Sequence, residues 1–417
     1  MRKMVRRVYW SIRKPLQIPL AFIWRRFLFR TTVIGITGSV GKTTTKEMVY
    51  AILSAQAPTV QTADNQNDMQ GNARGILSAR FKTKYLIIEY GTSRPGQIAK
   101  IGRLVKPHIA IAISVAKTHT RSFNTLEDTA KEKAEIFNYM AKGATAIINI
   151  DDPYVCDMAK QLQNKALRFG STTDCDIQHS AAESIWPQRL GLHIKSGDES
   201  QFVQTQLVGT HWASSVAAAV SIASACGVSL ADSAKAIAKM PPFIARMQPV
   251  GLPCGATLIR DEYNGSEETF EKMIAVLEQA QAKRVVLVMS DFSDSKAKAS
   301  KRQKRIGKMA AQLTSLAIFC SDSGHHAKKA AIAAGMDPEN CHHVMGLRAT
   351  SALMKETLRE GDLVFLKGWC TEHLSRLVFA QYGEFACWSE NCRYTCVCDV
   401  CGELSAKFDL RQMVKSV

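Results

Sequence analysis

The chain has 417 residues, of which 46% are hydrophobic and 22% are charged. This many apolar residues can bury the cores of two or three ordinary domains, which excludes a disordered or collagen-like chain. Lys and Arg outnumber Asp and Glu by 54 to 37, and the net charge of +17 favours partners that carry phosphate or other anionic groups.

The N-terminal segment, residues 1–30, holds nine Lys or Arg and no Asp or Glu. Apolar side chains recur in it at helical spacing: Leu16, Leu20, Ile23, Trp24, Phe27 and Leu28. The pattern predicts an amphipathic helix with Arg25, Arg26 and Arg30 on its opposite side. Two interpretations are open: the helix lies on an anionic membrane surface, or it packs against its own domain.

The same segment does not predict a membrane span. Its longest apolar run, Ile18–Trp24, is far shorter than the roughly 20 residues that a spanning helix needs. Arginines follow the run where a signal peptide would have a cleavage site of small residues. We expect a cytoplasmic protein, attached peripherally to the inner face of the membrane if the first interpretation holds.

Beyond residue 31, short β-branched runs alternate with helical stretches, including helices over residues 43–55 and from Gly96. Strands are predicted first at residues 32–37, 85–89, 109–115 and 144–149, and later at 257–260, 284–289, 316–320 and 363–366. Residues 175–208 have the pattern of an antiparallel β-sheet segment. The alternation is typical of α/β domains with a largely parallel sheet and helices on both faces.

We therefore predict an α/β fold with a P-loop central domain, a second Rossmann-like α/β domain and a short Cys-rich tail. The predicted boundaries are a basic arm at 1–31, the central domain at 32–246, the second domain at 247–383 and the tail at 384–417.

The strongest chemical signal follows the first predicted strand. Gly38-Ser39-Val40-Gly41-Lys42-Thr43-Thr44 is a glycine-rich loop that leads into a helix. Such a loop turns backbone N–H groups onto phosphate oxygens, its lysine reaches the terminal phosphates, and its first threonine offers a hydroxyl to Mg²⁺. Ile36 stands where the strict pattern has glycine, so this is a shortened variant. The loop predicts ATP binding.

Further segments continue this pattern in one order: Thr62–Asp68, Ile88–Ile98, Thr118–Phe123, Ala130–Phe137, Arg246 and Asp261–Asn264. Together with the loop they resemble the Mur ligase family, and most closely its D-alanyl-D-alanine-adding members, over residues 32–375. The resemblance implies an ATP-dependent ligase that activates a carboxylate as an acyl phosphate and joins it to an amine. A catalytically inactive ATP-binding scaffold at the membrane is the alternative.

The resemblance also implies roles for single residues. Thr43 and Glu89 would hold one Mg²⁺, while His119 and a carbamylated Lys133 would serve a second, and Lys42 completes the catalytic set. By itself, Lys131-Glu132-Lys133 is typical of a solvated helix face. The expected ATP contacts are Gly38, Ser39, Gly41, Lys42, Thr43, Thr44, Asn65, Arg246, Asp261 and Asn264.

Several positions depart from the family's pattern: Trp212, Ser215, Ala245, Gly265, Ser266, Trp369 and Cys370. These changes leave the phosphate and metal positions intact but alter the expected adenine and amine pockets. We therefore expect an amine other than D-alanyl-D-alanine. Because the family's UDP-sugar-gripping domain has no counterpart in residues 1–31, we also expect another peptide, amino acid or lipid-carried carboxylate.

Five of the twelve cysteines crowd into the tail, and the others are scattered as in a reduced protein. Cys387, Cys392, Cys398 and Cys401 predict a tetrahedral Zn²⁺ site, which leaves Cys396 spare. A redox pair and an iron–sulfur cluster are the alternatives. The basic stretch at residues 296–308 has no aromatic side chains for base stacking, so we do not expect nucleic acid as a partner.

Overall fold

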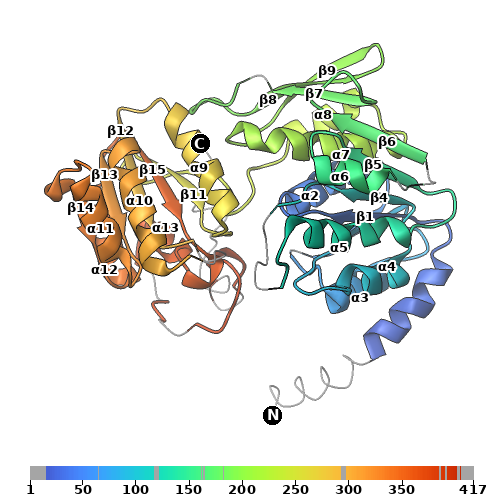
Figure 1. The fold of residues 1–417 in the computed structure, drawn as a ribbon, viewed down its shortest axis with the longest axis horizontal. Coiled ribbons are helices and arrows are strands. Elements are labelled where there is room, and N and C mark those ends of the chain that lie inside the picture. Colours follow the sequence, from blue (N-terminus) through green and yellow to red (C-terminus); the bar gives the residue numbers. More distant parts are fainter. Residues whose placement is uncertain are drawn as a thin grey trace. The chain divides into compact units, whose positions relative to one another are not determined.

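The computed structural model describes residues 16–63, 65–116, 122–160, 162, 165–181, 183–292, 297–384, 387–389, 392–401 and 404. Contacts divide the chain into two compact units. Unit 1 takes its residues from Met1–Glu183, Leu190–Thr205 and Thr210–Met240, and unit 2 from Ser184–Arg189, Gln206–Gly209 and Pro241–Val417. Each unit is an α/β body built on its own sheet (Figure 1).

In its described part, unit 1 has one sheet with the strand order β2-β3-β1-β4-β5-β6-β7-β8-β9. The first seven strands in this order are parallel, and β8 and β9 continue the sheet antiparallel. The strands are β1 Thr32–Thr37, β2 Thr59–Gln61, β3 Tyr85–Glu89, β4 Ile109–Ala112, β5 Thr145–Asn149, β6 Lys165–Gly170, β7 Ile177–Ala181, β8 Gly191–Ser196 and β9 Glu199–Gln204.

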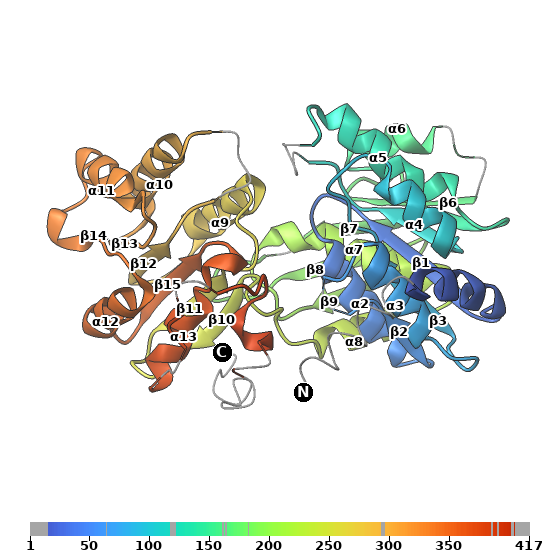
Figure 2. The ribbon, with the colours of Figure 1, turned by 90° about the horizontal axis from the view of Figure 1, so that it is seen from below.

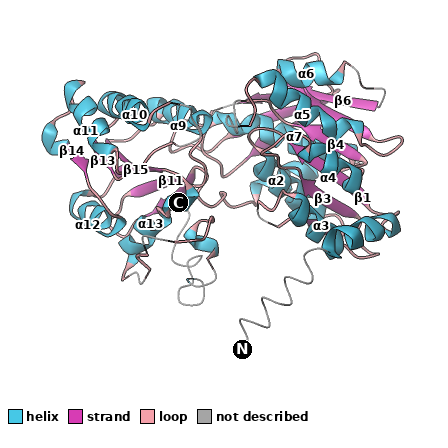
Figure 3. Ribbon diagram, turned by 60° about the horizontal axis from the view of Figure 1, so that its bottom comes forward, coloured by secondary structure: helices cyan, strands magenta, loops and turns pink. Residues whose placement is uncertain are grey.

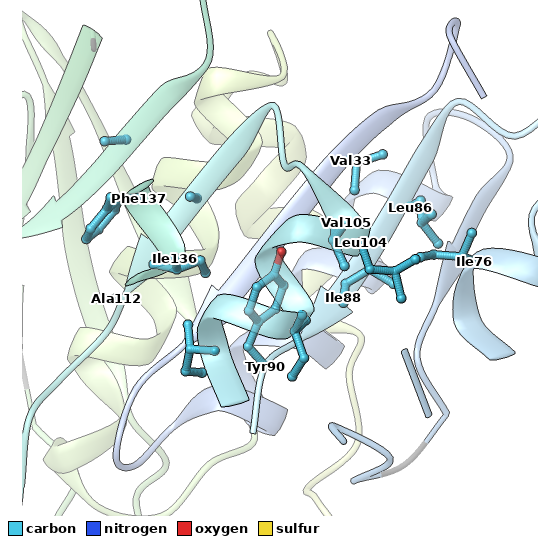
Figure 4. Close-up of a cluster of buried hydrophobic side chains, with 14 of the residues drawn as sticks. Val33, Ile76, Leu86, Ile88, Tyr90, Leu104, Val105, Ala112, Ile136 and Phe137 are labelled. Carbon is cyan, nitrogen blue, oxygen red and sulfur yellow. The ribbon is translucent and has the colours of Figure 1, made fainter. Parts of the chain in front are cut away.

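Helices cover both faces of this sheet. They are a helix over residues 16–27, α2 Lys42–Ser54, α3 Met69–Ser78, α4 Gln97–Val105, α5 Leu126–Asn138, α6 Pro153–Ala159, α7 Ala213–Ala225 and α8 Leu230–Ala238. Val33 and Leu86 pack in one core cluster with Ile76, Val105 and Ile136 from α3, α4 and α5 (Figure 4). The alternate strand residues, such as Ile34, are also fully buried, because side chains alternate between faces and both faces are covered.

In its described part, unit 2 has a sheet with the order β10-β11-β15-β12-β13-β14, parallel except for β10. Its strands are β10 Gln248–Gly251, β11 Thr257–Asp261, β12 Arg284–Met289, β13 Leu316–Phe319, β14 Cys341–His343 and β15 Asp362–Lys367. Its helices are α9 Glu267–Gln279, α10 Ala299–Leu313, α11 Gly324–Ala333, α12 Leu347–Thr357 and α13 Ser375–Tyr382.

The two faces of this second sheet have separate cores. Leu287 packs with side chains of α9, α10 and α11, whereas its neighbours Val286 and Val288 pack with α12 and α13. The helices accordingly lie on opposite sides of the strands (Figures 2 and 3). The predicted α/β fold with a mainly parallel sheet is confirmed.

Two details differ from the sequence-based expectation. The strand predicted over residues 109–115 ends at Ala112, because Ser114 leaves the ladder to bind the glycine-rich loop, accepting hydrogen bonds from Ser39 N and Val40 N. Strands β2, β6, β10 and β14 were not predicted. Strands β2, β10 and β14 have only three or four residues, too few to show a period, and the six residues of β6 include no β-branched side chain.

The predicted N-terminal helix is present over residues 16–27 of the described chain. Ala21 and Leu28 are buried in the core of unit 1, and Trp24 Nε1 donates to Ala79 O at 3.0 Å. Arg25, predicted on the polar side, instead points inward and donates from Nε to Val105 O at 2.6 Å. The helix therefore packs against its own domain, as one of the two interpretations requires.

Among the described residues, no helix combines the length and apolar character that crossing a bilayer demands.

Candidate functional site

The glycine-rich loop joins β1 to α2 in unit 1. Gly41 is the N-cap of α2 with φ 85°, a left-handed conformation that favours glycine, and a Cβ there would lie 2.7 Å from Ser215 Oγ. Ser215, which the sequence placed in the adenine pocket, therefore lies against the loop itself. The open N-terminus of α2 presents backbone N–H groups and the positive end of the helix dipole, which suit a phosphate.

The loop side chains are held in place. Ser39 Oγ donates to Ala116 O at 3.1 Å and accepts from Ala116 N at 2.8 Å. Lys42 Nζ lies across the loop and donates to Gly38 O at 2.7 Å and Ser39 O at 3.1 Å. Thr44 is buried, with no hydrogen-bond partner for its hydroxyl oxygen in the described residues. Lys42 is thus positioned at the loop, where a terminal phosphate would meet it.

Glu89, the last residue of β3, is 1% exposed and faces the start of α2. Its Oε1 accepts from Thr43 Oγ1 at 3.2 Å and from Asn67 Nδ2 at 2.8 Å. Its Oε2 accepts no hydrogen bond within the described residues, and Lys46 Nζ lies 3.8 Å from it. A buried carboxylate oxygen beside a threonine hydroxyl is a donor set that suits Mg²⁺.

The loop before α3 places Asn67 beside Glu89, while Asn65, which is predicted to contact ATP, is exposed. A Cβ at Gly91 would lie 2.1 Å from Asn67 Oδ1, so Gly91 is needed where the amide packs beside Glu89. Lys46, which the sequence analysis missed, is fully buried and donates to Thr62 O at 2.9 Å. The segment Thr62–Asp68 pointed to this part of the site, but its sequence could not show which of its asparagine side chains lies beside Glu89.

Lys133 lies on α5 and is 3% exposed, so the solvated helix face expected from its sequence is wrong at this position. Burial, and then the nearby Lys42, lower the pKa of the Lys133 amine well below its ordinary value. Both lysines line one cavity of about 400 Å³ with Asn67, Gly91, Thr92, Gln97 and Lys100. A neutral buried amine is the form that can react with carbon dioxide.

Glu132, the neighbour of Lys133, is a positioning residue that the sequence analysis did not recognise. It accepts from Gly96 N at 2.6 Å and Ile98 N at 2.8 Å, and so ties the start of α4 to α5 at the edge of the same cavity. Only Lys131 of this trio is exposed as expected. The predicted metal ligand His119 lies outside the described residues.

In unit 2, Arg246 lies between two residues with left-handed backbone, Ala245 with φ 56° and Met247 with φ 51°. Its guanidinium lies 4.0 Å from the centre of the Tyr263 ring, and Ala245 O accepts from Tyr263 N at 3.0 Å. The turn holds the guanidinium over the aromatic ring. Ala245, where the family's pattern has glycine, thus adopts a conformation that costs an alanine energy.

Asp261, at the end of β11, has a different environment from Glu89. Its Oδ2 accepts from Lys367 Nζ at 2.5 Å, and its Oδ1 accepts from Met247 N at 3.3 Å. Burial raises the pKa of Asp261, and Lys367 opposes this. The backbone oxygen of Asn264 accepts a hydrogen bond from Lys367 Nζ. Its Oδ1 accepts a hydrogen bond from the backbone N of Ser266, and Ser266 is the N-cap residue of α9.

Two of the departures from the family's pattern pack on one another. A Cβ at Gly265 would lie 2.9 Å from Trp369 Cε3, so glycine makes room for the indole. Trp369 N in turn donates to Glu372 at 2.7 Å. Trp212, another departure, is buried in unit 1 with its ring centre 4.7 Å from that of His211.

A second cavity, of about 1150 Å³, opens at the carboxyl ends of β12, β13, β14 and β15. This is the edge at which open α/β sheets bind ligands. Its charged lining comprises Asp291, Asp322, Glu372, Arg348 and Arg376. Burial raises the pKa of Glu372, and one of its oxygens already accepts from Trp369 N.

The Cys-rich tail is anchored to the body of unit 2. Arg260 is fully buried and binds Asp399 through two contacts of 2.7 Å, with Glu262 on its other side. Cys398 is buried, with its Sγ 3.6 Å from His373 Nδ1. Cys387 and Cys401 pack against the small apolar cluster that contains Cys398. Among the described residues, no three His, Cys, Asp or Glu side chains converge as a metal site.

Comparison with known proteins places these two units in one family. Residues 36–223 match the model of the Mur ligase middle domain, and residues 245–370 match that of the Mur ligase, glutamate ligase domain. The UDP-N-acetylmuramoyl-tripeptide–D-alanyl-D-alanine ligase of Mycobacterium tuberculosis is 27% identical over 380 residues, covering 86% of this chain and 74% of its own length. The Escherichia coli ligase of the same name is 29% identical, covering 69% of this chain and 64% of its own length.

Solved structures show the same fold. Crystal structure II of MurF from Acinetobacter baumannii aligns with a TM-score of 0.81 and 24% identity, covering 88% of this chain and 80% of that one. MurF from Thermotoga maritima, crystallised in complex with ADP, aligns with a TM-score of 0.69 and 22% identity, covering 87% and 82%.

Proposed function

Because this chain belongs to the Mur ligase family, we propose that Lys42, Thr43, Glu89 and Lys133 carry out its ATP-dependent joining of a carboxylate to an amine. The observation that carries this assignment lies within unit 1. Lys42 of the phosphate loop and Lys133, a buried lysine with a lowered pKa, line one cavity together with Asn67, which binds the buried carboxylate of Glu89. A scaffold that only binds ATP has no need of Lys133 or of the Glu89 carboxylate.

The chemistry has two steps. A carboxylate oxygen attacks the γ-phosphorus of ATP, the bond between that phosphorus and the β–γ bridging oxygen breaks, and ADP leaves with its electron pair. The neutral amine nitrogen then attacks the acyl carbon, and the bond from that carbon to the phosphate oxygen breaks. Inorganic phosphate leaves with the electron pair while the nitrogen releases a proton to phosphate or water. Lys42 and the N–H groups at the start of α2 neutralise charge on the phosphates, which is where such catalysis gains most. Ser39, Gly38, Gly41 and Thr44 shape this loop.

A divalent cation fits at Glu89 and Thr43, because one Glu89 oxygen is buried without a hydrogen-bond donor in the described residues. We assign Mg²⁺ to this position, and a second position to Lys133 as its carbamate together with His119. When bound, the cations neutralise the repulsion between the phosphate and the carboxylate. The chain's own contribution is to hold Glu89 through Asn67 and Thr43 at the edge of the loop.

Asp261 and Asn264 of the second domain, residues 247–383, are assigned to nucleotide contact, as are Asn65 and Arg246 of the first, residues 32–246. Support is strongest for Arg246, whose guanidinium lies over the Tyr263 ring. Asp261 acts indirectly in this proposal, because Lys367 already occupies its carboxylate.

The substrates differ from those of the relatives in this proposal. Trp369 packed on Gly265, and a cavity that bears three carboxylates and two arginines, favour an amine that carries an additional charge. The carboxylate donor is a peptide, an amino acid or a lipid-carried molecule. The relatives' names specify a UDP-linked tripeptide and D-alanyl-D-alanine for those enzymes.

The test is phosphate release from ATP with Mg²⁺, measured over paired amino acids and peptides that include D-alanyl-D-alanine. We expect release only when a carboxylate and an amine are both present. Lys42→Ala should abolish it, and Lys131→Ala, on the exposed side of α5, should not. Phosphate release that is independent of both substrates would show an ATPase and reject the ligase assignment of these residues.

We also propose that the tail binds one Zn²⁺ through Cys387, Cys392, Cys398 and Cys401. Neighbouring sulfur and nitrogen ligands of a tetrahedral zinc are about 3.5 Å apart, close to the 3.6 Å between Cys398 and His373. His373 is therefore a rival to Cys392. Metal analysis should give about one equivalent of zinc. The zinc should be lost in Cys398→Ser/Cys401→Ser and kept in the control Cys396→Ser. Comparing Cys392→Ser with His373→Ala identifies the fourth ligand.

Finally, we propose that the N-terminal segment attaches the enzyme peripherally to the inner face of the cytoplasmic membrane. The positive charge of residues 1–30, without a single acid, supports this assignment.

A further inference from the structure

The helix over residues 16–27 has an outward surface that is as apolar as its inward one. Of eleven large apolar side chains that are exposed in the described part of the chain, seven lie on this helix or beside it. They are Leu16, Leu20, Phe22, Ile23, Phe27, Phe29 and Phe81. Phe81 comes from the connection between α3 and β3 and joins the group through Trp24, at a ring distance of 5.1 Å. We call these seven side chains the apolar face.

The orientation of the helix is fixed, so the apolar face is not a core surface turned the wrong way. Ala21 and Leu28 are buried, and Trp24 and Arg25 donate to backbone oxygens at the ends of α3 and α4. Leu16, Leu20, Ile23 and Phe27 follow one another at intervals of four, three and four residues on the outward side. A contiguous exposed apolar surface of this kind marks an interaction site.

Positive charge surrounds the apolar face. Exposed cationic side chains on the same segments are Arg26, Arg30, Arg80, Lys82 and Lys84. Arg26 lies 4.7 Å from the Phe22 ring and Arg30 lies 5.8 Å from the Phe29 ring. The sequence has no Asp or Glu at residues 1–46, 69–88 or 90–126. These ranges include the backbone oxygens that accept hydrogen bonds from Trp24 and Arg25 of the helix. The surface therefore pairs apolar side chains with unopposed cations.

We infer that the apolar face is the part of the enzyme that inserts into an anionic lipid surface, with Phe29 and Phe81 as its most exposed side chains. Phe29 is 75% exposed and Phe81 is 67% exposed. Cations beside aromatic and aliphatic side chains match the headgroup region of an anionic bilayer, where both kinds of group gain energy. The inference rests on the proposed membrane attachment of residues 1–30, and not on the ligase chemistry.

Other occupants match the surface less well. A second copy would pair the face with itself in a two-fold dimer, which would bring cations against cations without an acid to neutralise them. Nucleic acid would satisfy the arginines and lysines but would leave the leucine, isoleucine and phenylalanine side chains in water. Only a lipid surface uses both components.

The experiment is co-sedimentation of the full chain with vesicles of phosphatidylcholine alone and with vesicles that also contain phosphatidylglycerol. We expect binding to the anionic vesicles, reversed by high salt. Phe29→Ser/Phe81→Ser should weaken binding by about tenfold or more, because the variant has lost two large apolar side chains whose transfer from water into the lipid favours binding. Arg26→Gln/Arg30→Gln should weaken it and reduce its salt dependence.

Phe202→Ser is the matched control, since Phe202 is 43% exposed on β9 of the same unit and lies outside the apolar face. Point variants are preferable to deletion of residues 1–30, which would uncover the core around Ala79 and Val105. Phosphate release without vesicles should be the same in all of these variants, so a failure of the ligase assignment is seen separately.

Three results would overturn the inference. The first is equal binding of the native chain and Phe29→Ser/Phe81→Ser. The second is loss of binding only when Arg6 and Arg7 are replaced, which would leave the arm as a purely electrostatic tether. The third is a dimer in solution, measured by light scattering, that the phenylalanine variants convert to monomer.

Discussion

Two carboxylates, Glu89 in unit 1 and Asp261 in unit 2, occupy equivalent places at the ends of parallel strands. Both were predicted from sequence to serve ATP. Asp261 is bound by Lys367 Nζ at 2.5 Å, whereas Lys46 Nζ lies 3.8 Å from the Glu89 oxygen that accepts no hydrogen bond within the described residues. Asp261 is committed to an ion pair inside the protein, and Glu89 keeps an oxygen for a ligand.

The comparison shows that burial alone does not make a carboxylate functional. A buried acid with a full set of protein partners stabilises its surroundings, while a buried acid with an incomplete set is arranged to bind something else. Lys46 belongs to this arrangement, because its ammonium is shared with Thr62 O and Glu47 and so neutralises Glu89 only in part.

The largest effect should come from breaking the committed pair. Lys367→Met leaves Asp261 buried without its cation, and we expect a loss of about 3–5 kcal/mol in the free energy of unfolding. Denaturant titration measures it. Asp261→Asn/Lys367→Met should recover part of the loss, and a single Lys367→Met variant as stable as the native chain would remove the distinction between the two carboxylates.

The next largest effect concerns Glu89. Glu89→Gln keeps the size of the side chain and removes the charge that would meet a cation, so we expect turnover to fall by about 10²–10³. Stability should change little, because Lys46 keeps its closer partners Glu47 and Thr62 O. The control is Thr62→Val, which removes the hydroxyl that binds Glu89 N; if Glu89→Gln lowers stability more than turnover, Glu89 is structural after all.

The next prediction concerns Lys133, whose lowered pKa should make the stability of the protein depend on pH. Its pKa is lowered in the folded chain, so between that pKa and its ordinary value of 10.5 the unfolded chain binds a proton that the folded chain does not. The stability of bicarbonate-free protein should therefore rise with pH in this window, by up to about 1.4 kcal/mol per pH unit. Lys133→Met should flatten this rise in denaturant titrations at several pH values, and Lys131→Met should not.

Adding ¹³C-bicarbonate near neutral pH should give a carbamate signal by NMR that is absent in Lys133→Met and present in Lys131→Met. If the signal is absent from native protein in the presence of Mg²⁺ and ATP, Lys133 acts as a neutral amine and the second metal position has lost a ligand.

The smallest effect is expected at the turn that holds Arg246. Ala245→Gly relieves a left-handed alanine with φ 56° and should raise the free energy of unfolding by about 1 kcal/mol. Ala256→Gly, at a buried alanine without positive φ, should lower it. A destabilising Ala245→Gly would mean that the turn depends on the alanine methyl group and is not strained.

Much of the fold was readable from local pattern. The predicted strands, such as Thr32–Thr37 and Arg284–Met289, are short runs rich in β-branched residues, and the phosphate loop is a contiguous motif. Sequence could not show that Arg25 turns inward, because the backbone oxygens it meets belong to residues 105 and 106. The helical period was correct, but it could not reveal that Leu16, Leu20, Ile23 and Phe27 face outward while Ala21 and Leu28 are buried.

The sequence by itself determined the phosphate loop, the alternation of strands and helices and the family, because each of these depends on neighbouring residues or on motifs in a fixed order. Only folding shows which groups are available: Asn67 lies beside Glu89, Lys133 is buried, one Glu89 oxygen accepts no hydrogen bond within the described residues, and Asp261 is bound by Lys367. The physical reason is that desolvation and hydrogen bonding depend on partners brought together by folding. Lys367, which takes Asp261 out of reach, lies 106 residues further along the chain.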